Sequence, residues 1–114
     1  MSQFVREDRW EQIILFSHEG LKMASAGRSP VYHEDRLLEG ALSLQDAARI
    51  IQPETPVQEF EIRGRQGRRL LFRFFPAGHD TLAVAVVVRG RKGYRRAMAR
   101  MIRSIQERIG ASGT

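Results

Sequence analysis

The sequence contains no cysteine among its 114 residues, and this absence excludes disulfide bonds, thiolate metal ligands and thiol nucleophiles. Long apolar runs are absent too, because none approaches the roughly 20 residues that a membrane-spanning helix needs. The first ten residues, MSQFVREDRW, are polar and mixed in charge, which predicts no secretory signal. We therefore expect a single soluble domain in the cytoplasm, without membrane insertion.

Lysine is scarce as well, and all but two of the 19 basic residues are arginine, the exceptions being Lys22 and Lys92. The formal net charge of +6 favours acidic partners, which include nucleic acid, anionic lipid and an acidic protein face. The alternative is that these arginines form ordinary solvated faces. Since no nucleic-acid-binding motif is recognisable, direct binding of nucleic acid is the less favoured interpretation.

The most informative stretch is residues 81–88, TLAVAVVV, where no side chain after the first is polar. Its shortness, its valines and the turn-forming residues on both sides predict a strand rather than a helix. Successive side chains of a strand point to opposite faces, so an unbroken apolar run indicates that both faces are covered. We expect this strand to lie in the centre of a sheet with helices on each side.

The other elements follow from changes in apolar periodicity and from turn residues. In chain order we predict strands at 11–16 and 21–26, a helix at 33–51, strands at 57–63, 68–75 and 81–88, and a helix at 94–109. Residues 1–10 form an N-terminal arm, Gly110 is the predicted C-cap of the last helix, and 110–114 form a frayed tail. All 114 residues thus make one domain.

Both predicted helices are amphipathic. The apolar stripe of the middle helix consists of Leu37, Ala41, Leu44, Ala48 and Ile51, and Leu38 and Leu42 lie beside it. The stripe of the last helix consists of Tyr94, Met98, Met101, Ile102, Ile105 and Ile109, with Arg96, Arg100 and Arg103 on the opposite side. These arginines are candidates for binding an acidic protein face, or they are the solvated side of the helix.

No residue grouping indicates chemistry. The histidines, His18, His33 and His79, lie in separate turns or at a helix start without metal-ligand spacing, so we expect no metal and no cofactor. No serine lies in a nucleophile-elbow context, and we expect no enzyme activity. The turn RGRKG at 89–93 lacks the GK[ST] ending of a phosphate-binding loop, which favours an ordinary polar turn over an anion site.

The chain resembles the Roadblock/dynein light chain family over about residues 11–109. The segments that support this are IILFSHEGLKMASAG (13–27), LLEGALSLQDAARII (37–51), EFEIRGRQGRRLLFRFF (59–75) and LAVAVVV (82–88), followed by the closing helix. The resemblance implies a profilin-like α+β fold, with a five-stranded antiparallel sheet of order 2-1-5-4-3 and one long helix on each face. The chain departs from the family in its truncated first helix.

Members of this family are non-enzymatic dimers that serve as scaffolds or regulators, many of them for small Ras-like GTPases. The resemblance therefore implies a homodimer or heterodimer and a protein partner such as a small GTPase. We expect the charged edge strand at 57–63 to pair with its own copy. The residues expected at this interface are Leu38, Leu42, Val57, Glu59, Phe60, Glu61, Ile62 and Arg63.

Two other functional classes fit parts of the pattern. A PAS-type ligand-binding sensor shares the strand and helix order, but its pocket between helices and sheet is not indicated by the single long middle helix. A basic nucleic-acid-binding protein fits the net charge, and its binding would weaken steeply with salt. The regulatory or scaffold role is the interpretation that we favour.

Overall fold

The computed structural model describes residues 1–7, 9–55, 57–90 and 93–112. Its helices are α1 (Ser2–Glu7), α2 (Glu34–Ile51) and α3 (Arg95–Ser112), with a short 3₁₀ helix, η1 (Arg65–Gly67). Its strands are β1 (Trp10–Ser17), β2 (Lys22–Gly27), β3 (Glu59–Arg63), β4 (Arg68–Ala77) and β5 (Asp80–Arg89).

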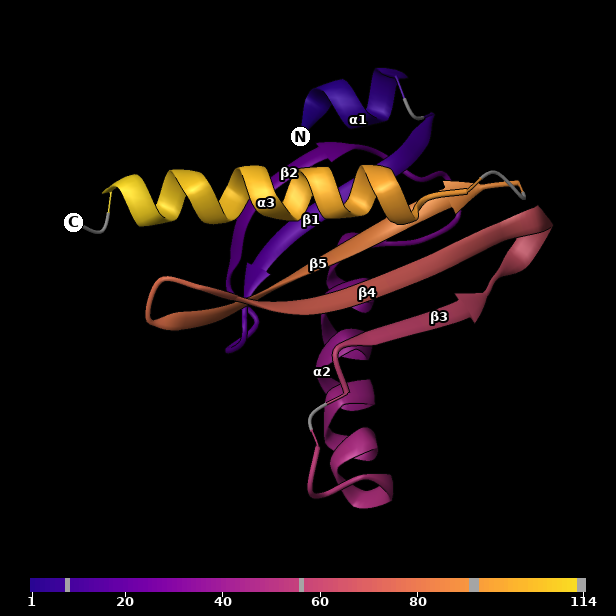
Figure 1. The fold of residues 1–114 in the computed structure, drawn as a ribbon. Helices are drawn as coiled ribbons and strands as arrows, with labels where there is room; N and C mark the ends of the chain where they lie inside the picture. Colours follow the sequence, from indigo (N-terminus) through magenta and orange to yellow (C-terminus); the bar gives the residue numbers. More distant parts are fainter. Residues whose placement is uncertain (8, 56, 91–92, 113–114) are drawn as a thin grey trace.

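The five strands form one sheet in the order β2-β1-β5-β4-β3, and every neighbouring pair is antiparallel. Figure 1 shows α1 and α3 on one face of this sheet and α2 on the other. Two tight turns require a left-handed backbone, and each has glycine at that position: Gly20 (φ 90°) between β1 and β2, and Gly78 (φ 62°) between β4 and β5. The predicted α+β fold and strand order are confirmed.

The central strand β5 is buried on both sides, as its apolar run predicts. All residues from Leu82 to Val88 are at most 4% exposed. Leu82, Val84, Val86 and Val88 point to the face of α1 and α3, whereas Ala83, Ala85 and Val87 point to the face of α2. The alternation places two small alanines opposite α2 and larger side chains opposite α1 and α3.

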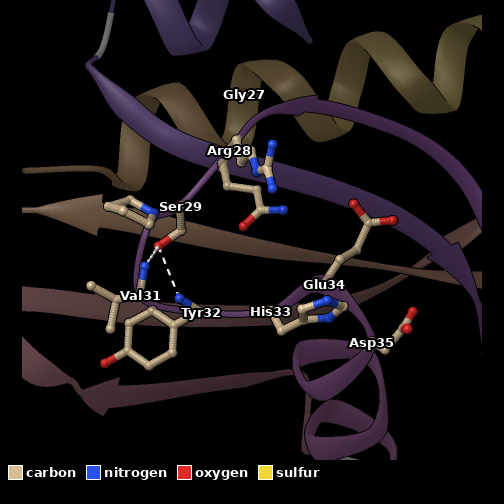
Figure 2. Close-up of a pocket in the computed structure, with 10 residues that line it drawn as sticks. Gly27, Arg28, Ser29, Val31, Tyr32, His33, Glu34 and Asp35 are labelled. Atoms are coloured by element: carbon tan, nitrogen blue, oxygen red, sulfur yellow. Dashed lines mark hydrogen bonds between the residues drawn. The ribbon is translucent and has the colours of Figure 1, made fainter.

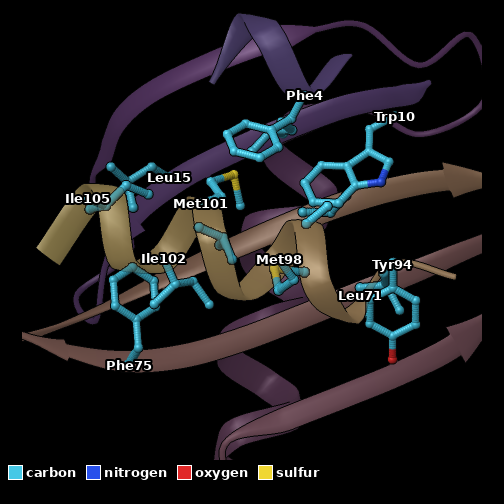
Figure 3. Packing of buried hydrophobic residues seen from close by; sticks show 14 of the residues in the cluster. Phe4, Trp10, Leu15, Leu71, Phe75, Tyr94, Met98, Met101, Ile102 and Ile105 are labelled. Atoms are coloured by element: carbon cyan, nitrogen blue, oxygen red, sulfur yellow. The ribbon is translucent and has the colours of Figure 1, made fainter. Parts of the chain in front are cut away.

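The larger core lies between the sheet and α3 (Figure 3). Met98 and Met101 are essentially inaccessible to solvent, and the predicted apolar stripe of this helix faces the sheet. Trp10 stacks on Phe4 of α1 with ring centroids 5.6 Å apart. The short first helix thus packs over β1 and β2, on the same face of the sheet as α3, and contributes the buried ring of Phe4.

The smaller core lies under α2, where the buried helix residues are Leu37, Ala41 and Ala48. The expectation that Ile51 belongs to this core is wrong, because its side chain is 84% exposed. In Figure 1 the C-terminal turns of α2 extend away from the sheet. The stripe therefore loses its partner surface before the helix ends.

Element ends differ from prediction by one to three residues at several places, among them both ends of α3 and the start of β3. α3 continues through Gly110 to Ser112, so the predicted C-cap is wrong and the predicted tail is helical as far as 112. Glycine in an exposed last turn costs only about 1 kcal/mol, and a helix tolerates it. At the other end, Tyr94 precedes α3, and its carbonyl oxygen accepts the backbone N–H of Met98 at 2.9 Å. β3 begins at Glu59, which leaves Val57 outside the strand.

Candidate functional site

The outer edge of β3 is a surface available for strand pairing. Within the described residues β3 pairs with β4 alone, from Glu59 opposite Arg73 to Arg63 opposite Arg69. Phe60 packs edge-on against Phe74, with ring centroids 6.3 Å apart. The next residue on the same face, Ile62, is 37% exposed. An edge strand with backbone donors and acceptors on its outer side can accept a further strand.

Glu61 lies on the opposite face of β3, between Tyr94 and Arg69. The Tyr94 hydroxyl donates to Glu61 Oε2 at 3.3 Å, and Arg69 Nη1 lies 3.7 Å from Glu61 Oε1. The Arg69 guanidinium also lies over the Tyr94 ring, 5.3 Å from its centroid. Burial, followed by the charges of Glu59 and Glu61, raises the pKa of the Tyr94 phenol. These contacts fix the edge strand to the start of α3.

The two α2 residues predicted at a dimer interface, Leu38 and Leu42, are half-buried. Leu38 packs against the smaller core under α2. Leu42 lies so close to Gly20 that a Cβ added to this glycine would be 2.9 Å from Leu42 Cδ1. A more exposed apolar surface lies at the end of the same helix, where Ile50 and Ile51 are each 84% exposed. The sequence signal for this surface is a pair of adjacent isoleucines directly before the helix end.

The arginines predicted to bind a partner lie on the solvent side of α3. Arg96, Arg100 and Arg103 are all exposed, and their spacing of four and three residues places them along one side of the helix. The Arg100 guanidinium lies 6.0 Å from the ring centroid of Phe4. The surface is therefore a continuous basic strip that borders α1.

The structure does not bring the histidines together. His18 lies after β1 and forms a 3.8 Å contact with Glu19, His33 is the N-cap of α2, and His79 lies between β4 and β5. The described part of the chain contains no group of three side chains that can ligate a metal ion. In the same ranges, no helix has the length and apolarity required to cross a bilayer.

The comparisons with known proteins give a match in structure but not in sequence. No family model matches the sequence, and no curated protein matches it. Among solved structures, MglB from Myxococcus xanthus superposes with a TM-score of 0.69 at 13% identity, covering 98% of this chain and 90% of that one. The gliding protein MglB from Thermus thermophilus superposes with a TM-score of 0.71 at 15% identity, covering 96% of this chain and 84% of that one.

A Roadblock/LC7 domain from Streptomyces avermitilis superposes with a TM-score of 0.62 at 18% identity, covering 90% of this chain and 84% of that one. These three structures share the fold with this chain over nearly its whole length. At such identities the likeness concerns the fold, which is Roadblock-like.

Proposed function

Because this chain has a Roadblock-like fold, we propose that it is a non-enzymatic, dimeric regulatory or scaffold subunit that acts on a small Ras-like GTPase. The observation that best supports this role is the superposition on two MglB structures over 96% or more of the chain. The family resemblance of the sequence implies the same class of partner.

The proposed homodimer forms by antiparallel pairing of β3 with its own copy. Two sheets then join into one, and the outer N–H and C=O groups of the strand gain partners. Centring the pair on Glu61 places Glu59 opposite Arg63 on one face. On the other face it places Phe60 opposite Ile62, which would cover the exposed part of that isoleucine.

This register also places Glu61 opposite its own copy, and like charges directly opposite are unfavourable. The contacts of Glu61 reduce this cost, because Arg69 lies 3.7 Å away and Tyr94 donates to the carboxylate. Centring the strand pair on Phe60 would instead oppose Glu59 with Glu61 in two pairs, and no arginine of the partner strand would lie opposite either carboxylate. The charge pattern of the strand therefore favours the register centred on Glu61.

The exposed end of α2 supplies the apolar part of the proposed interface. Ile50 and Ile51 would each expose a large side chain in an isolated protomer. Burying such a side chain contributes roughly 1.5–3 kcal/mol. Strand pairing at β3 brings α2 of the two copies to the same side of the joined sheet. Contact between these helices is thus a way to cover both isoleucines.

The basic strip of α3 is the proposed partner surface. It lies on the opposite face of the sheet from α2, so dimerisation through α2 and β3 leaves it accessible. Arginines at the rim of an interface mainly raise the association rate and make it sensitive to salt. An acidic face on a GTPase would match this charge.

A pull-down from the native cytosol, at low and at high salt, tests the proposal. The expected result is recovery of a small GTPase or of proteins in complex with it, with weaker recovery at high salt. Recovery of nucleic acid alone, lost steeply with salt, would contradict the proposal and favour the nucleic-acid interpretation.

A further inference from the structure

A cavity of about 830 Å³ lies where the chain leaves β2 and enters α2. Its walls are the ends of β1 and β2, the connecting segment 28–33 and the first turn of α2 (Figure 2). This cavity is on the opposite face of the sheet from the basic strip of α3, and it is separate from the edge of β3. None of the roles proposed above uses it.

Gln12 is the buried polar residue that makes this cavity unusual. It pairs with Gly27 on β2 and with Val87 on β5, so its side chain points to the α2 face of the sheet. The residue is 4% exposed, and among the described residues its Oε1 atom has no hydrogen-bond partner. Burying an acceptor without a donor destabilises a fold, and such a group in a native structure calls for an explanation.

Donors are placed on another wall of the same cavity. His33, the N-cap residue of α2, makes no side-chain bond to the first turn, whose N–H groups have no partner within the helix. The Ser29 hydroxyl oxygen accepts the N–H groups of Val31 and Tyr32, each at 3.2 Å, which leaves its proton to donate (Figure 2). The exposed Arg28 guanidinium adds a positive charge.

The charges around the cavity are of both signs. Arg28 and the start of α2 favour an anionic group. Asp35 is an exposed carboxylate in the same wall, and Glu34 is neutralised by Lys22, whose Nζ lies 2.9 Å from Glu34 Oε1. A ligand with only negative charge would meet Asp35 unfavourably. A ligand with adjoining positive and negative groups would match the wall.

We propose that this cavity binds a free α-amino acid. Its carboxylate would lie at Arg28, Ser29 and the first turn of α2. Its ammonium group would donate to Gln12 Oε1 and face Asp35. One zwitterion would thus supply a donor to the buried Gln12 Oε1 and an acceptor to the free N–H groups at the start of α2.

Titration of the protein with the standard L-amino acids, one at a time, tests the proposal. Heteronuclear NMR would follow the side-chain amide of Gln12 and the backbone amides of Ser29 and Asp35. At least one amino acid is expected to shift all three signals saturably. Its N-acetyl derivative, which lacks the cation, and its carboxamide, which lacks the anion, are each expected to bind at least about tenfold more weakly.

Two variants separate binding from folding. Gln12→Leu removes the buried acceptor and is expected to raise the melting temperature of the free protein while weakening amino-acid binding at least about tenfold. Arg28→Ala alters an exposed side chain and is expected to weaken binding similarly without changing the melting temperature. Arg36→Ala is the matched control, because Arg36 is an exposed arginine in the first turn of α2 that does not line the cavity.

The proposal is overturned if no amino acid in the set binds saturably. It is also overturned if both Gln12→Leu and Arg28→Ala bind as the unaltered protein does, or if the N-acetyl and carboxamide forms bind equally well. Loss of GTPase binding in a separate assay has no bearing on these results, since the two surfaces lie on different faces of the sheet.

Discussion

Arg68 Nε donates to both carboxylate oxygens of Glu11, at 2.9 and 3.0 Å, and joins two strands through residues that are 57 positions apart in the sequence. The Arg68 side chain is 4% exposed and that of Glu11 is 15% exposed. Arg68 Nη1 also donates to Gln66 Oε1 at 2.9 Å. The guanidinium is therefore a buried charge, and among the described residues its ion-pair partner is the Glu11 carboxylate.

Glu11→Gln is expected to destabilise the protein by about 3–5 kcal/mol, because it leaves the Arg68 charge buried and uncompensated. The double variant Glu11→Leu with Arg68→Met is expected to recover most of this loss. Urea unfolding monitored by circular dichroism measures both. Glu107→Gln is the control for charge at an exposed position. If Glu11→Gln lowers the free energy of unfolding no more than this control does, the ion pair does not stabilise the fold.

The burial of β5 on both faces leads to a second prediction. The side chains of Val86 and Ala85 point to opposite faces of the sheet. Val86→Asp and Ala85→Asp are each expected to prevent folding. An unpaired buried charge costs several kcal/mol, and a domain is stable by only about 5–15 kcal/mol. Thr81→Asp, at the exposed start of the same strand, is the control. Normal melting of either core variant would contradict the two-sided burial.

The third prediction concerns self-association. Light scattering at high micromolar concentration is expected to give twice the chain mass of 13.1 kDa. Ile62→Pro is expected to give monomer or unfolded chain, since proline cannot donate to the β3–β4 ladder, in which Ile62 is the partner of Leu70, and the pairing edge is disrupted with it. Ile51→Asp tests the α2 surface without that risk, because its side chain is 84% exposed, and it is expected to weaken the dimer.

Leu21→Asp is the matched control for Ile51→Asp, because Leu21 is 66% exposed but lies beside β2, at the other edge of the sheet. It is expected to leave the dimer unchanged. A mass of 13.1 kDa for the unaltered protein at the highest concentration would exclude the proposed dimer.

The fourth prediction follows from the raised pKa of Tyr94. The unfolded chain loses the phenolic proton near pH 10, while the folded protein retains it. Between these two pKa values the folded state binds more protons, so the free energy of unfolding falls as pH rises. Urea unfolding at a series of pH values from about 9 to 11 measures this fall. The free energy of unfolding of Tyr94→Phe is expected to fall less steeply with pH. Equal slopes for the variant and the unaltered protein would exclude the effect.

The elements of the fold were predictable because their signals are local. The apolar run of β5, the stripe of α3 and the glycines of the tight turns each specify structure within a few residues. The strand order required the family resemblance, since periodicity alone does not say which strands pair. The burial of Ile51 was predicted wrongly because it depends on how α2 leaves the sheet.

Other features depend on contacts between distant segments. The face of the sheet to which the Gln12 side chain points cannot be read from the sequence. It depends on the register shift between Trp10 and Gln12, where β1 pairs with β5. The ion pair of Glu11 with Arg68 requires two strands that are separated by β5 in the sheet. Such relationships come from tertiary structure, and no pattern within either segment indicates them.

The proposed regulatory role depends on binding of a small GTPase, and a direct titration measures it. The GTPase encoded nearest this gene would be loaded with GDP or with a non-hydrolysable GTP analogue and titrated with the protein at low and high salt. Arg100→Glu with Arg103→Glu is the test variant. Arg36→Glu with Arg65→Glu is the control, with the same change of net charge at exposed arginines away from α3.

The unaltered protein is expected to bind one nucleotide state more tightly than the other. The α3 variant is expected to keep its melting temperature and dimer mass but to associate about tenfold more slowly at low salt. The control variant is expected to associate as fast as the unaltered protein. No binding in either nucleotide state, together with tight and salt-dependent binding to DNA or RNA, would contradict the proposed role.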